Sequence, residues 1–165
     1  MDFFNLYPLS WAGILSAVIV GTIVGLERQI FGKPAGIRTS ALICLGSYLF
    51  IALSQSVLGP KSGDATRVLG QIVSGIGFLG AGVIISKEGT IQGVTSAAVI
   101  WVLAGMGALI GFGYYSDAYF LALVILSILM GIEWLERMIK ILMDRRKQDQ
   151  LPSQSTLKGP ELPPL

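Results

Sequence analysis

The sequence contains no histidine and a single cysteine, Cys44, among its 165 residues. A lone cysteine cannot form an intrachain disulfide, and without histidine a structural zinc site is not expected. Charge is also scarce, since only 13% of the residues are Asp, Glu, Lys or Arg. No nucleophile–base pair and no GxxxxGK phosphate loop is visible. The sequence therefore predicts no enzyme, no metal site, no cofactor and no nucleic-acid partner.

Apolar residues dominate what is present. They make up 53% of the chain, and the mean hydropathy is +0.71, which is too high for a soluble domain of this size. Five apolar runs each approach the roughly 20 residues that cross a bilayer. They lie at about 9–26, 39–58, 66–85, 91–112 and 118–135. The sequence predicts an all-α polytopic membrane protein with five transmembrane helices.

These five runs form one predicted transmembrane domain over residues 1–143. The segment 144–165 is rich in Pro, Ser and Gln and has no hydrophobic periodicity, so it is predicted to be a disordered cytoplasmic tail.

The basic residues predict the orientation of the domain. The N-terminus and the second and fourth loops together hold two bases, Lys61 and Arg67. The other side holds the remaining ten: Arg28, Lys33, Arg38, Lys87, Arg137, Lys140, Arg145, Arg146, Lys147 and Lys158. Because bases accumulate on the cytoplasmic side, the N-terminus is predicted outside and the C-terminus inside.

The third run, read as a helix, sorts its side chains into three sectors. One sector is broad and aliphatic, and a narrow stripe of small residues opposite it includes Gly70, Gly77 and Ala81. Beside the stripe lies a polar edge: Asp64, Arg67, Gln71 and Ser74. Arg67 is expected to point into the helix bundle, since polar groups in a membrane need protein or water partners. The edge is either a charged mouth for an ion or small solute, or an ion pair that pins the helix end.

The first run carries a small residue at every fourth position: Gly13, Ala17, Gly21 and Gly25. This ridge is predicted to pack closely against another helix, plausibly against the small stripe of the third run. Glu27, Arg28 and Arg38 follow on the cytoplasmic side. They are either a functional charged motif or the ordinary charged helix ends at the membrane surface.

Four segments resemble the MgtC/SapB family of membrane proteins: GLER at 25–28, GIRTSALICLGSYLF at 36–50, DATRVLGQIVSGIGFLGAGVI at 64–84 and QGVTSAAVIWV at 92–102. The resemblance implies a five-helix membrane domain in the bacterial inner membrane, and a link to magnesium limitation, virulence and stress adaptation. Many members add a soluble domain after the helices, whereas the tail of this chain is expected to be too short to fold. Ser40 stands where the family often has His, and Ala65 where it often has Pro.

Two functions follow as hypotheses. In the first, the chain is a non-enzymatic protein that binds other membrane proteins, or itself as a homo-oligomer, and supports growth at low magnesium or under envelope stress. In the second, it is a small oligomeric transporter or channel for Mg²⁺ or another small solute along the third helix. The lack of clustered acids favours the first hypothesis, because Mg²⁺ prefers several oxygen ligands. The polar edge favours the second.

Overall fold

The computed structural model describes residues 6–58, 64–87 and 89–149. In this part of the chain, five helices and one β-hairpin follow in the order α1 (Trp11–Ile30), α2 (Ile37–Leu58), α3 (Asp64–Gly82), β1 (Ile85–Lys87), β2 (Thr90–Gln92), α4 (Val94–Gly111) and α5 (Tyr115–Asp149). The predicted helical architecture is confirmed. The chain divides into two compact units, residues 1–126 and 127–165, and the first of them contains the whole of α1 to α4.

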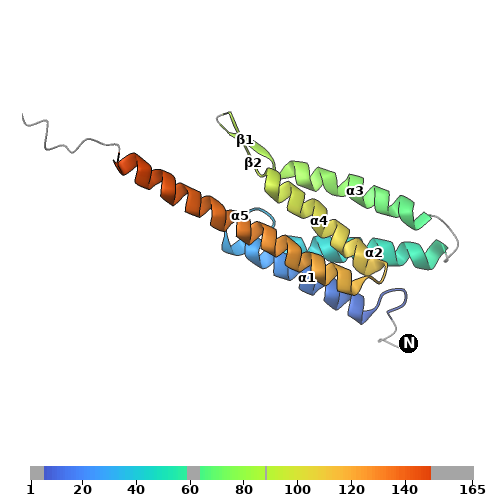
Figure 1. Cartoon of the computed structure of the whole chain (residues 1–165). Helices are drawn as coiled ribbons and strands as arrows, with labels where there is room; N and C mark the ends of the chain where they lie inside the picture. Colours follow the sequence, from blue (N-terminus) through green and yellow to red (C-terminus); the bar gives the residue numbers. More distant parts are fainter. Residues whose placement is uncertain (1–5, 59–63, 88, 150–165) are drawn as a thin grey trace, which may run out of the picture. The chain divides into compact units, whose positions relative to one another are not determined.

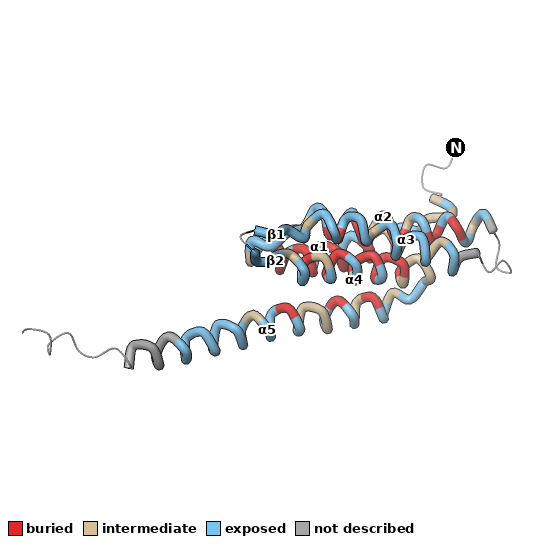
Figure 2. Tube along the Cα trace, turned by 90° about the horizontal axis from the view of Figure 1, so that it is seen from above, coloured by how far each residue is buried: buried red, intermediate tan, exposed pale blue. Residues whose placement is uncertain are grey.

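Successive helices from α1 to α4 run in opposite directions (Figure 1). Helix α1 packs on α2, α2 packs on α4, and α4 packs on α3. The core therefore lies among α1, α2 and α4, where Figure 2 shows the buried residues of these elements. Helix α3 lies at the edge of this arrangement, and within its described part only Gly80 is buried.

The start and end of α1 show how local sequence sets these boundaries. Ser10 caps the helix, because its Oγ accepts a hydrogen bond of 3.0 Å from the backbone N–H of Gly13. The helix runs past the predicted end at residue 26 and includes Glu27 and Arg28. The predicted run stopped at the first charged residue, but Glu, Arg and Gln favour a helix, so the helix continues to Ile30, shortly before Gly32 and Pro34.

The β-hairpin corrects the all-α prediction. Ile85–Lys87 pairs antiparallel with Thr90–Gln92, with Ile85 opposite Gln92 and Lys87 opposite Thr90. Gly89 has φ of 78° at the turn, a conformation that glycine adopts readily. The isoleucines of this segment were assigned to helical spans, although β-branched residues also favour strands. The third and fourth runs are therefore shorter than predicted.

Helix α5 is continuous from Tyr115 to Asp149 and so extends well beyond the predicted run 118–135. The prediction of a disordered tail from residue 144 is wrong for 144–149, which are helical. Residues 150–165 lie outside the described part of the chain.

Four of the described helical segments are long and apolar enough to cross a membrane: Trp11–Ile30, Ile37–Val57, Val94–Gly111 and Tyr115–Met143. Helix α3 is not among them, although it has 19 residues. Polar residues in its first two turns, Asp64, Arg67 and Gln71, lower its hydropathy.

Candidate functional site

The small-residue ridge of α1 is buried, as predicted, and it packs on α2. A Cβ atom on Gly21 would lie 2.6 Å from the Cα of Ala41 and 2.6 Å from the carbonyl oxygen of Ser40. A Cβ on Gly25 would lie 2.7 Å from the Cα of Ile37. The two backbones approach this closely because glycine has no side chain there. The expectation that the ridge meets the third run is wrong, since its partner is α2.

The last turns of α1 hold a buried charged pair. The Arg28 side chain is 3% exposed and Glu27 is 5% exposed, with 3.7 Å between Arg28 Nη1 and Glu27 Oε2. Arg28 Nη2 also donates a hydrogen bond of 2.7 Å to the Oγ of Ser96, in the first turn of α4. Glu27 and Arg28 are therefore not exposed charges at the helix end, and a functional role for them stays a prediction.

We name Glu27, Arg28 and Ser96 the α1–α4 cluster. Burying two charges is costly unless they pair and form further hydrogen bonds. The hydrogen bond from Arg28 to Ser96 meets this need, and it joins two helices because the two residues are 68 positions apart in the sequence. The Nε of Arg28 has no hydrogen-bond partner among the described residues. Arg38 is exposed in the first turn of α2, so the structure does not bury it with the other two predicted residues.

Sequence reasoning missed Ser96. The residues next to it in the sequence do not identify it as a hydrogen-bond partner between helices, because serines are common in apolar helices of membrane proteins. Its one signal is its place within the segment 92–102 that carries the family resemblance.

The polar edge of α3 lies on the exposed surface of the first unit. Arg67, Gln71 and Ser74 are all exposed, which contradicts the expectation that Arg67 points into the bundle. Asp64 begins the helix, but its side chain lies outside the described part. The Asp64–Arg67 ion pair therefore stays a prediction.

The small stripe of α3 also faces away from the neighbouring helices. A Cβ added to Gly70 or Gly77 would have no neighbouring atom within 4 Å, and Ala81 is exposed. The predicted packing role of these three residues within the chain is therefore wrong. Instead, α3 contacts α4 through its other side, where a Cβ on Gly80 would lie 3.6 Å from the Cβ of Ala97. We call the exposed side formed by Arg67, Gly70, Ser74, Gly77 and Ala81 the outer face of α3.

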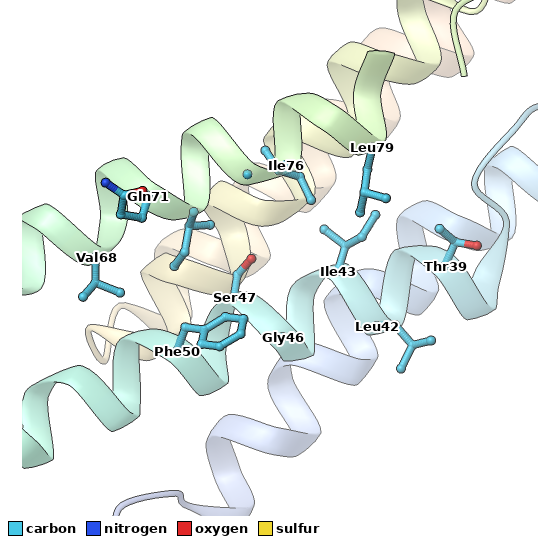
Figure 3. Close-up of a pocket in the computed structure, with 12 residues that line it drawn as sticks. Thr39, Leu42, Ile43, Gly46, Ser47, Phe50, Val68, Gln71, Ile76 and Leu79 are labelled. Atoms are coloured by element: carbon cyan, nitrogen blue, oxygen red, sulfur yellow. The ribbon is translucent and has the colours of Figure 1, made fainter. Parts of the chain in front are cut away.

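A groove of about 640 Å³ separates α3 from α2 (Figure 3). Half of its lining residues are aliphatic, with Phe50 at one end and Leu79 toward the other. Gln71 reaches this groove from the edge of the outer face. Within the described residues, no group of three or more Cys, His, Asp or Glu side chains could hold a metal ion.

Comparisons with known proteins agree with the family resemblance of the four sequence segments. The model of the MgtC family matches residues 14–138. Protein MgtC of Salmonella typhimurium strain LT2 is 42% identical over 113 residues, which cover 68% of this chain and 48% of that protein. Protein MgtC of Brucella abortus strain 2308 is 39% identical over 117 residues, 71% of this chain and 48% of that protein.

The chain thus spans about half the length of the curated relatives it matches. No solved structure matches it significantly. The family model covers Ala17, Gly21 and Gly25 of the ridge of α1, the α1–α4 cluster and the outer face of α3. On these grounds, the chain belongs to the MgtC family.

Proposed function

We propose that the chain is a bacterial inner-membrane protein that binds a transmembrane helix of another membrane protein through the outer face of α3. By this interaction it supports growth when magnesium is scarce. The observation that carries the proposal is the exposure of glycines and polar side chains together on one side of α3. The inner-membrane location and the link to magnesium rest on the family resemblance.

The chemistry of the outer face suits a protein partner. Lipid tails offer no hydrogen bonds, so Ser74 on this face and Gln71 at its edge are costly to expose to hydrocarbon. Gly70 and Gly77 leave room for another backbone to approach closely, and such contacts drive helix association in membranes. A partner helix would therefore gain both close packing and hydrogen bonds at the same place.

We also propose that α3 crosses the membrane, which gives five spans with the N-terminus outside and the C-terminus inside. Helices α2 and α4 pack together and run in the same direction (Figure 1). Because both are long and apolar enough to span, the chain has to return across the bilayer between them, and α3 is the helix that connects them. The division of bases, two against ten, favours the stated orientation.

Cysteine labelling tests this topology. In a Cys44→Ala background, Ser62→Cys should react with a membrane-impermeant maleimide added to whole cells, because it precedes α3 on the outer side. Lys158→Cys should react only after the membrane is permeabilised. Labelling of both positions in whole cells, or of neither, would contradict five spans, since three spans separate these two sites and place them on opposite sides.

Transport along α3 has less support. The described residues of the polar edge, Arg67, Gln71 and Ser74, are exposed, so the described helices of a single chain enclose no route along them. A channel would need several copies arranged around this edge. Mg²⁺ binding would also need several oxygen ligands, and the outer face offers no carboxylate among its described side chains.

Filling the outer face tests the proposed function. Gly77→Leu should leave the chain folded, because its Cβ meets no neighbouring atom within 4 Å and leucine favours a helix more than glycine does. The larger side chain should keep a partner helix at a distance, so low-magnesium growth should fail at a normal membrane level of the protein. Gly105→Leu is the matched control, since Gly105 is exposed on α4 with no neighbour within 4 Å.

A further inference from the structure

The groove between α2 and α3 is a second feature of the membrane domain, separate from the outer face of α3. It is lined by aliphatic side chains and by Phe50, and its polar lining residues are Thr39, Ser47 and Gln71 (Figure 3). Its volume of about 640 Å³ lies within the range of ligand pockets, roughly 300–1,000 Å³. An occupant of this groove has to be mainly hydrocarbon.

Glycines give the groove its depth. Gly46 on α2 and Gly75 on α3 both line it, and a Cβ on either would meet no neighbouring atom within 4 Å. Side chains of ordinary size at these two positions would fill the space between the helices. The groove therefore exists because both helices have glycine there.

The length of the groove suits an acyl chain of one leaflet. Its lining on α2 runs from Thr39 to Phe50, which is about 16 Å at 1.5 Å per residue. This length is close to half of the roughly 30 Å hydrocarbon core, the depth of one leaflet.

The end of the groove at Thr39 lies beside positive charge. Arg38 is the neighbouring residue in the first turn of α2 and is exposed, and the backbone N–H groups of this turn favour anions. Lys87 is also exposed, on the β-hairpin at the same end of the four helices (Figure 1). Of the acids at this end, Glu27 is buried with Arg28, and Glu88 lies outside the described residues. This end therefore suits a phosphate group.

We propose that the groove binds one acyl chain of an anionic phospholipid, with the headgroup phosphate at the Arg38 end. With the orientation proposed above, this lipid comes from the cytoplasmic leaflet. The lipid completes the packing between α2 and α3, which the protein leaves open. It leaves the outer face of α3 free for a protein partner, so the two proposals fail or hold independently.

Native mass spectrometry tests the proposal. The full chain is released from nanodiscs that contain equal amounts of phosphatidylglycerol and phosphatidylethanolamine, and the retained lipid is counted. The wild-type chain should retain phosphatidylglycerol in preference to phosphatidylethanolamine. The variant Gly46→Leu/Gly75→Leu should lose most of this lipid because leucine side chains fill the groove, whereas Gly105→Leu should retain it. Arg38→Gln should lower the preference for phosphatidylglycerol about fivefold, the effect of one base near a membrane surface.

Equal lipid retention by Gly46→Leu/Gly75→Leu and Gly105→Leu would overturn the proposal. So would a wild-type chain that retains the two lipids equally. If the double variant instead changes a dimer into a monomer on size-exclusion chromatography with light scattering, the occupant is a second copy and the proposal is also wrong. Arg38 is exposed on the surface, so the Arg38→Gln arm gives a result even if the double variant fails to fold.

Discussion

Gly21→Ala should lower the free energy of unfolding by about 2 kcal/mol or more, although it adds a single methyl group. The new Cβ would lie 2.6 Å from both the Cα of Ala41 and the carbonyl oxygen of Ser40. Both atoms belong to the backbone of α2, so no side-chain rotation relieves the clash and the two helices have to separate. The loss exceeds the roughly 1 kcal/mol that alanine gains over glycine in a helix. Thermal unfolding of the purified chain in mild detergent measures the difference.

Gly105→Ala is the matched control for this prediction. Gly105 is also inside a helix, but a Cβ there has no neighbour within 4 Å. The control should therefore keep the wild-type stability or gain slightly from better helix propensity. Similar unfolding temperatures for Gly21→Ala and Gly105→Ala would contradict the close contact between α1 and α2.

Arg28→Met should destabilise the chain by about 3–5 kcal/mol, the range measured when one partner of a buried ion pair is removed. Glu27 is 5% exposed, and the substitution removes the guanidinium that lies 3.7 Å from its carboxylate. It also breaks the hydrogen bond from Arg28 Nη2 to Ser96, which joins α1 to α4. Chemical denaturation in detergent, with the amount of folded protein in the membrane as a second readout, measures the effect.

The double variant Glu27→Gln/Arg28→Met separates charge from packing. It removes both charges, so it should recover a large part of the lost stability, and the double-mutant cycle should give a coupling of several kcal/mol. Ser96→Ala should cost less, about 1–3 kcal/mol, because it removes one hydrogen bond of a charged donor. Wild-type stability of Arg28→Met would show that the α1–α4 cluster is not a buried ion pair.

Sequence alone located the ridge of α1 because the signal is local: four small residues at regular spacing in one apolar helix. It did not identify the partner of the ridge. Small residues occur in several of the predicted helices, and spacing along one helix does not say which neighbour it faces. The approach of Gly21 to Ala41 depends on how two helices are placed in space.

The α1–α4 cluster shows a similar limit. Glu27 and Arg28 stand at the end of an apolar run, where charged residues at the membrane surface are common. Their burial depends on α4, whose Ser96 is 68 residues further along the chain. No pattern around residues 27 and 28 contains that information.

For helix α3, helical periodicity groups the side chains into three sectors, but it does not show which sector faces the other helices. The sequence predicts that the sector of small residues faces the bundle, and this prediction is wrong. In the structure, Gly80 faces α4 and Gly77 faces outward. The β-hairpin was missed for a related reason, since short runs rich in isoleucine fit a strand and a helix end equally well.

The central claim is that the outer face of α3 carries the function, and its most direct test is growth in low magnesium. Cells of a strain from which this gene is deleted are supplied with the wild type, Gly77→Leu or Gly105→Leu, and the membrane level of each protein is measured beside growth. We predict that the wild type and Gly105→Leu restore growth and that Gly77→Leu does not, at equal membrane levels. Growth with Gly77→Leu as good as with the wild type would contradict a role for this face, and failure of the wild type itself would contradict the link to magnesium.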